Sequence, residues 1–240
     1  TAYDHNARKL WIVNVHDPKV AGYQLELFLD MAWDINCVNE SSIETHYLRW
    51  LCRQFGDEAG KLLFPAMKEY YKLCAQRRPE FMGWTQVELD KKKYNRGLSP
   101  IQDTEFSIHE ISEYLGRYAS ISATVKKVEN IIPARLKDAY FAAIVYPVLA
   151  ADAHARKLLL AQKARQTGDA VAAEQSLEAY KEIKTLTERY NNDLAGGKWR
   201  NLMSMNPRNL PVFGMPDTAY VHDSLNVSVV MDEYEYISRN

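Results

Sequence analysis

The sequence lacks several features that would assign a function class directly. No run approaches the roughly 18 apolar residues that a membrane-spanning helix needs. Lys and Arg together number 30 against 31 Asp and Glu, a net charge of -1, so no nucleic-acid or membrane-surface partner is indicated. The cysteines (Cys37, Cys52 and Cys74) are few and widely spaced. They predict neither a disulfide framework nor a metal motif, and they leave the cellular compartment open.

A short apolar segment near the start of the chain predicts a β-strand. Residues 10–15 are rich in β-branched side chains, which favours a strand buried on both faces, as in a parallel sheet. Residues 23–33 follow with apolar side chains at helical spacing. A single strand cannot satisfy its ladder hydrogen bonds. We therefore expect the chain to begin inside a larger α/β domain.

From residue 41 onward the pattern is helical. Start and stop signals divide this part into five long helices, at about residues 41–56, 57–78, 107–130, 133–166 and 170–194. Ser41 with Glu44, and Ser107 with Glu110, have the spacing of a capping box. Pro147 predicts a kink in the fourth helix. The short connections favour an antiparallel bundle.

The C-terminal part changes character after Gly196-Gly197, which ends the last helix. A proline-rich stretch at 207–216 excludes a regular helix or a central strand. Residues 225–231 alternate weakly like a strand. The predicted fold is mainly α: a βα unit at 1–40, the five-helix bundle at 41–216, and a linker with a first strand toward a β domain at 217–240.

Five segments suggest a family. They occur in the order LWIVNVHD (10–17), FLDMAWD (28–34), RRPE (77–80), DAYFAAIVYPVLA (138–150) and YNNDLAGGKWRNLM (190–203). Their order and spacing resemble glycoside hydrolase family 115, the xylan α-glucuronidases, over about residues 10–216. The resemblance implies that residues 1–40 are the last strand and helix of a (β/α)₈ barrel, that the helical bundle follows, and that a C-terminal β-sandwich comes next.

The resemblance also implies an activity, the removal of glucuronic acid or its 4-O-methyl ether from xylan with inversion. An inverting enzyme needs two carboxyl groups about 6.5–9.5 Å apart, and barrel enzymes carry them at the C-terminal ends of several strands. This chain holds one such strand end. We therefore expect the catalytic carboxylates to lie outside the chain and the isolated chain to be structural and inactive.

The same resemblance bears on ligands and partners. No cofactor is expected, and His46, His109 and His154 fall on separate predicted helices, so no metal site is expected either. The implied partners are xylan or another glucuronic-acid-bearing oligosaccharide, the barrel and β domains of the same protein, and a second copy in a possible homodimer. An extracytoplasmic location, periplasmic or secreted, is implied as well.

Asn14, His16 and Asp17 are the candidate substrate-binding residues, because they lie at the C-terminal end of the predicted barrel strand. The family usually has Asn-Val-Gly-Asp here, and its asparagine resembles a sugar-contacting residue. Asn14 and Asp17 match, whereas His16 replaces the glycine and adds a side chain. The alternative is that Asn14 and Asp17 only hydrogen-bond the loop and cap the following helix.

The loop after Gly-Gly-Lys-Trp is the second candidate region. Family members tend to continue with Gln-x-His-Ile-Gly-Tyr-x-x-Trp, a segment that can reach an active site. Here residues 205–213 replace the histidine, glycine, tyrosine and tryptophan with Pro207, Asn209, Leu210 and Phe213. Arg208 could pair with a uronate carboxylate, or it could be a solvated loop arginine.

Three hypotheses remain open from the sequence. The chain is part of an α-glucuronidase, as the ordered motifs indicate. It is a free-standing helical interaction or carbohydrate-binding module, as the self-sufficient bundle allows. It derives from a glycosidase that has lost activity, as His16 and the altered loop allow.

Overall fold

Helices account for the regular structure of the computed structural model, which describes residues 2–15, 17–79, 82–83, 101–207 and 210–219. The α-helices are α1 (Gly22–Trp33), α2 (Ile43–Phe55), α3 (Asp57–Gln76), α4 (Ile108–Glu129), α5 (Lys137–Tyr140), α6 (Tyr146–Thr167) and α7 (Ala170–Asn192). Shorter helical turns are Pro18–Val20, Ala134–Leu136, Phe141–Val145, Leu194–Gly197 and Pro211–Phe213. Over these residues the mainly α prediction is confirmed. None of the described helices is long and apolar enough to cross a bilayer.

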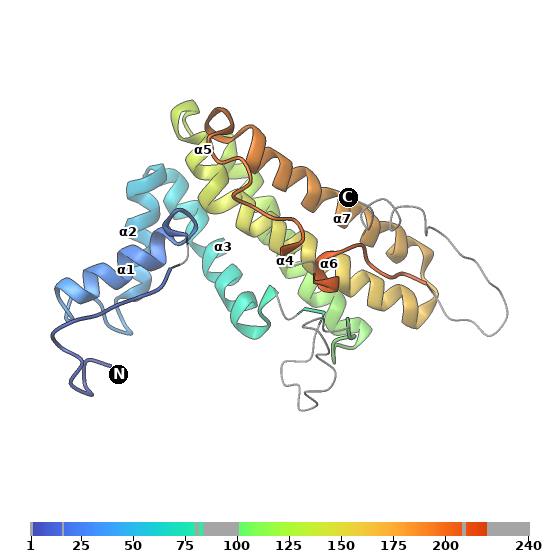
Figure 1. The fold of residues 1–240 in the computed structure, drawn as a ribbon, viewed down its shortest axis with the longest axis horizontal. Helices are drawn as coiled ribbons and strands as arrows, with labels where there is room; N and C mark the ends of the chain where they lie inside the picture. The colour runs from blue at the N-terminus through green and yellow to red at the C-terminus, as the bar shows by residue number, and fades with distance from the viewer. Residues whose placement is uncertain (1, 16, 80–81, 84–100, 208–209, 220–240) are drawn as a thin grey trace.

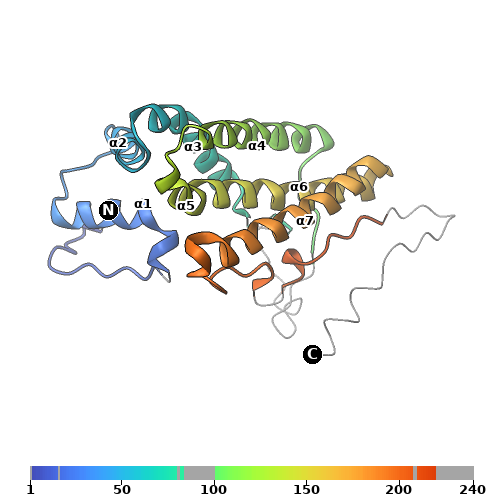
Figure 2. The ribbon, with the colours of Figure 1, turned by 90° about the horizontal axis from the view of Figure 1, so that it is seen from above.

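The long helices pack into an elongated bundle, seen in Figures 1 and 2. The principal helix contacts are between α6 and α7, α2 and α3, α3 and α4, and α4 and α6. α6 is central and is buried over most of its surface. The bundle places one continuous core between these helices. Its fully buried large side chains are Leu51, Leu63, Leu73, Tyr118, Val125, Tyr140, Val148, Leu159, Tyr190 and Val212.

Two helices begin at side-chain caps, and the first of these is the capping box predicted at Ser107 and Glu110. At α4 the Ser107 hydroxyl accepts a hydrogen bond from the Glu110 amide, 3.2 Å, and the Glu110 carboxylate accepts one from the Ser107 amide, 2.8 Å. At α7 the Asp169 carboxylate accepts from the Ala172 amide, 3.0 Å. Both caps satisfy amides that lack a partner within the helix.

The capping box predicted at Ser41 and Glu44 is wrong. α2 begins at Ile43, and its preceding residue, Ser42, makes no side-chain cap. Instead the Asn39 side chain accepts hydrogen bonds from the amides of Ser41, 3.0 Å, and Ser42, 3.1 Å. The Ser41 hydroxyl also donates to Asn39 Oδ1, 2.7 Å, so Asn39 engages both the Ser41 hydroxyl and the Ser41 amide that a capping box would pair with Glu44.

The irregularity predicted at Pro147 lies one turn earlier. Residues Phe141–Val145 form a π-helical turn, and Pro147 then occupies the first turn of α6. Proline cannot donate an amide hydrogen bond, and its ring clashes with the carbonyl four residues back. The wider π turn accommodates both effects before α6 begins.

Residues 10–15 do not form a strand within the described chain. Leu10 is 75% exposed and Ile12 is 85% exposed, so the predicted burial on both faces is absent here. A strand requires a neighbouring strand for its hydrogen bonds, and the described residues contain none. The strand predicted at 225–231 lies outside the described residues.

α1 is attached to the bundle through aromatic and polar contacts. The Tyr23 ring lies 4.3 Å from the Tyr47 ring and 5.5 Å from the Trp50 ring, measured between centroids. His46 Nε2 lies 3.1 Å from the Asp30 carboxylate. These contacts place the segment before α1 at one end of the bundle, where the candidate site forms.

A substitution at Gly60 tests how closely α2 and α3 approach each other. A Cβ at Gly60 would lie 2.6 Å from the Cys52 backbone nitrogen, so we expect Gly60→Ala to lower the free energy of unfolding by about 1–3 kcal/mol through overpacking. Gly116 in α4 is the matched control, because its Cβ would meet no atom within 4 Å. Gly116→Ala should raise stability by about 0.5–1 kcal/mol. Urea denaturation measures both, and equal effects at the two glycines would contradict the close approach.

Candidate functional site

The segment that carries the predicted sugar-binding residues meets the segment that follows α7. Asp17 begins the turn Pro18–Val20, where its carbonyl accepts from the Val20 amide, 3.2 Å. Lys19 Nζ then lies 4.4 Å from the centroid of the Trp199 ring and 5.9 Å from that of Tyr190. Residues 180 positions apart in the sequence therefore form one site.

The Gly-Gly pair shapes the chain reversal that presents Trp199. Ala195, Gly196 and Gly197 all have left-handed backbones, with φ of 50°, 64° and 80°. The Asp138 carboxylate accepts a hydrogen bond from the Ala195 amide, 2.8 Å. Consecutive left-handed residues disfavour side chains with a Cβ. The Gly196-Gly197 pair is thus explained by backbone conformation and needs no chemical role.

A second anchor holds the chain beyond Trp199. The Asn191 side chain accepts from the Met203 amide, 3.0 Å, and donates to the Met203 carbonyl, 2.8 Å. These paired bonds fix residues 199–203 against the end of α7. Trp199 is consequently half-buried and packs against the core.

Burial and neighbouring charges perturb the groups of this site. Partial burial lowers the pKa of Lys19, the Asp138 carboxylate opposes this, and the Lys198 ammonium adds to it. Burial, followed by Tyr146 and Asp17, raises the pKa of Tyr190 to about 12. The Tyr190 hydroxyl is buried and has no hydrogen-bond partner among the described residues. The site therefore contains two aromatic rings, two lysine ammonium groups and one buried hydroxyl without a hydrogen-bond partner in the described chain.

The predicted site residues are placed only in part. Asn14 is exposed and Asp17 is half-buried, both on the segment that leads to Lys19. The Asp17 side chain makes no cap to the turn Pro18–Val20 that follows it. Their substrate roles stay predictions. His16, Arg208 and Asn209 lie outside the described residues.

Sequence reasoning missed Lys19, Asp138 and Tyr190 as members of the site. Asp138 and Tyr190 begin two of the segments that carry the family resemblance, but that position alone did not connect them to residue 17. Lys19 had no motif of its own. The described residues contain no group of three or more His, Cys, Asp or Glu side chains that could hold a metal ion.

The end of the candidate loop lies away from this site, on the side of α6. The segment after α7 runs back along the bundle (Figure 1). The Phe213 ring packs 5.4 Å from the His154 ring. Lys157 Nζ donates to the carbonyls of Val212, 2.8 Å, and Gly214, 3.0 Å. Lys157 is eleven residues beyond Tyr146, which contacts Tyr190, a distance of about 16 Å along a helix.

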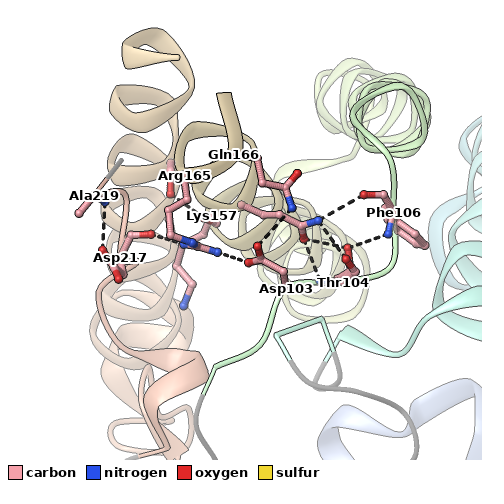
Figure 3. A network of polar contacts seen from close by, with 10 residues as sticks. Asp103, Thr104, Phe106, Lys157, Arg165, Gln166, Asp217 and Ala219 are labelled. Atoms are coloured by element: carbon pink, nitrogen blue, oxygen red, sulfur yellow. Dashed lines mark hydrogen bonds and ion pairs between the residues drawn. The ribbon is translucent and has the colours of Figure 1, made fainter. Parts of the chain in front are cut away.

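Basic side chains of α6 pack against this part of the tail. Burial lowers the pKa of the fully buried Lys157 to about 7, and burial followed by the Lys157 charge lowers that of His154 to about 3. Further along, Arg165 binds the Asp103 carboxylate and the Asp217 carbonyl, as Figure 3 shows. A cavity of about 450 Å³ lies beside these residues. Its polar groups largely pair with one another.

Known proteins resemble this chain in both sequence and structure. The model of the family described as Glycosyl hydrolase family 115 matches residues 1–81. A solved structure, described as a family GH115 4-O-methyl-α-glucuronidase with specificity for decorated arabinogalactans, is 38% identical and covers 95% of this chain with a TM-score of 0.82. The chain belongs to glycoside hydrolase family 115. The match covers 29% of that family 115 structure, so this chain spans less than a third of its relative. No curated protein matches the sequence.

Gly197 tests the turn before Trp199. In Gly197→Ala the new Cβ would lie 3.1 Å from the Asn192 carbonyl at a φ of 80°, so we expect a loss of about 1–3 kcal/mol in unfolding free energy. Ala195→Gly is the opposite control, because it relieves a left-handed alanine and should stabilise by about 1 kcal/mol. Denaturation and Trp fluorescence report the two effects. A neutral Gly197→Ala would show that the turn does not need glycine.

The pH dependence of stability tests the lowered pKa of Lys157. Its folded pKa of about 7 lies below the unfolded value of 10.5, so the unfolded state binds more protons between these values and stability rises with pH. From pH 7 to 9 this gain is about 2 kcal/mol. Lys157→Met removes the group, so denaturation at pH 7, 8 and 9 should show a smaller rise in the variant. Parallel pH profiles would contradict the lowered pKa.

Proposed function

We propose that the protein carrying this chain hydrolyses α-linked glucuronic acid, or its 4-O-methyl ether, from a decorated polysaccharide with inversion. The supporting observation is the likeness to a 4-O-methyl-α-glucuronidase, at 38% identity over 95% of the chain. Polymers of this kind are met outside the cytoplasm, so the proposal includes an extracytoplasmic location, periplasmic or secreted.

In this proposal residues 1–40 supply the last strand and helix of a (β/α)₈ barrel. The exposed apolar side chains of this part support it: Leu10 is 75% exposed, Ile12 85%, Leu29 54% and Trp33 94%. Side chains of this size gain about 1.5–3 kcal/mol each on full burial. Neighbouring barrel strands and helices would cover them, and residues 10–15 would then gain partners for strand pairing.

Asn14 and Asp17 are proposed as substrate contacts. Asn14 lies at the C-terminal end of the predicted strand and Asp17 on the segment between that strand and α1, the side of a barrel where active sites form. An amide and a carboxylate can each hydrogen-bond sugar hydroxyl groups. The contact of Lys19 with Trp199 then extends the same site onto the bundle.

The catalytic carboxylates are proposed to come from other strands of the barrel. Near the site the described chain offers Asp17 and Asp138, and the Asp138 carboxylate already accepts from the Ala195 amide. An inverting mechanism needs one carboxylic acid for the leaving oxygen and one carboxylate for the water. We therefore propose that residues 1–240 alone are inactive, with the bundle supporting the barrel.

The polysaccharide remains part of the proposal. The family resemblance suggests xylan, whereas the solved relative is described as specific for decorated arabinogalactans. The departures from the family pattern at His16 and at residues 205–213 favour a specificity different from that of the xylan enzymes. We propose a glucuronic-acid-bearing polysaccharide as the substrate class and test both polymers.

The full-length protein and residues 1–240 are compared on glucuronoxylan and on a glucuronic-acid-bearing arabinogalactan. We expect only the full-length protein to release the uronic acid, and the β-anomer to appear first by NMR, because inversion of an α-linkage produces it. In Asn14→Ala, kcat/KM should fall by about 100-fold, as expected for a misplaced substrate. Asn36→Ala, an exposed loop change, should leave the rate unaltered.

The opposite results have distinct meanings. Sugar binding without hydrolysis by the full-length protein would support a binding module or a glycosidase that has lost activity. Release of the α-anomer first would contradict inversion. An unaltered rate in Asn14→Ala would remove Asn14 from the site.

A further inference from the structure

We propose that Lys19, Lys198 and Trp199 bind the uronic acid itself, the two ammonium groups facing its carboxylate and the indole facing its ring. The inference rests on the proposed function and names the part of the site that distinguishes an acidic sugar from a neutral one. None of these three residues belonged to the candidate site predicted from sequence.

Lys19, Lys198 and Trp199 converge from two parts of the chain. Lys19 Nζ lies 4.4 Å and Lys198 Nζ 5.1 Å from the centroid of the Trp199 ring. Lys19 comes from the turn next to Asn14 and Asp17, and the other two come from the reversal after α7. Because Asp138 and Asn191 fix that reversal, the three groups are held together by the fold.

The positive charges of Lys19 and Lys198 favour an anionic ligand. In the described part of the chain neither lysine has a carboxylate within ion-pair distance, although 13 such pairs occur elsewhere in it. The Asp138 carboxylate raises the pKa of Lys19, and one of its oxygens accepts from the Ala195 amide, 2.8 Å. The half-buried Lys19 ammonium also experiences the Lys198 ammonium, which disfavours its charged form. A bound carboxylate would offset both the burial of the Lys19 ammonium and its repulsion by the Lys198 ammonium.

The aromatic residues beside the two lysines suit a sugar ring. Trp199 is half-buried, so its indole is fixed and part of it stays accessible. A fixed aromatic side chain offers a large rigid contact surface with a polar edge, which suits the C–H face of a sugar ring. The Tyr190 ring centroid lies 5.9 Å from Lys19 Nζ, and the Tyr190 hydroxyl is buried without a partner among the described residues. A structural core usually satisfies such a group; in the described chain only the His154 Nε2 atom on α6 shares this state.

A purely structural role makes a different prediction. If the contact of Lys19 with Trp199 only attached the turn to the bundle by a cation–π interaction, its loss would affect every substrate equally. If the lysines recognise the carboxylate, its loss would affect only acidic substrates. The comparison of an acidic with a neutral substrate therefore separates the two roles.

The test uses the full-length protein and two substrates: an oligosaccharide bearing 4-O-methylglucuronic acid, and the same oligosaccharide after reduction of its carboxyl group to hydroxymethyl. In Lys19→Gln and in Lys198→Gln we expect KM for the acidic substrate to rise about tenfold, as for loss of one charge-assisted contact. On the reduced substrate kcat/KM should stay within about twofold. Lys19→Arg, which keeps the charge, should recover most of the affinity for the acidic substrate.

Lys72→Gln, an exposed change on α3, is the matched control and should alter neither substrate. Unchanged thermal midpoints show that the variants are folded. An equal loss on both substrates, or no loss on either, would overturn the proposal in an active enzyme. If the unmodified protein cleaves neither substrate, the proposed function fails separately, and calorimetric titration with glucuronate and glucose decides this inference. Binding of glucuronate but not of glucose, lost in Lys19→Gln, would support it. No binding of glucuronate would overturn it.

Discussion

The structure depends on one chain reversal, the left-handed turn at Ala195–Gly197 that the Asp138 carboxylate holds through the Ala195 amide. Without it α7 would direct the chain away from the bundle, and Trp199 could not reach Lys19. The same reversal sends the following residues back along α6, where Val212 and Phe213 are packed. A backbone conformation that glycine adopts without strain thus decides both the site at the end of the bundle and the course of the tail.

α6 carries the polar groups that receive this tail. Lys157 is fully buried yet donates to two tail carbonyls, and His154 lies beneath Phe213. Burying an ammonium among carbonyl oxygens lowers its pKa, because the oxygens replace only part of its hydration. The loop that diverges most from the family pattern is therefore supported by a specific set of contacts on α6. The end of this loop, at Phe213, lies on α6 and apart from the site at Lys19 and Trp199. Of the divergent loop residues, only those nearer the reversal can therefore alter that site.

Much of the fold could be predicted from sequence, for local reasons. The five long helices were predicted to within a few residues, because the cap at Ser107 and Glu110 and the cap at Asp169 involve neighbours in the chain. The Ser41 box failed because Asn39 engages the Ser41 amide and the Ser41 hydroxyl. Residues 10–15 failed for another reason: a strand is stabilised by partners, and the described chain supplies none. Of the candidate site, the position of Asn14 and Asp17 beside the bundle could be checked, whereas their contacts with sugar depend on residues from elsewhere.

By itself the sequence determined where helices begin and end and which family the chain resembles, since capping, helical periodicity and ordered motifs are read from residues close together in the chain. The tertiary structure alone decided that Lys19 and Trp199 meet across 180 positions, and that Phe213 lies on α6 instead. Those contacts arise from the packing of α1 on α2 and of α6 on α7 and from the reversal at Gly197. No local pattern encodes the distance between two segments whose separation is set by a shared core.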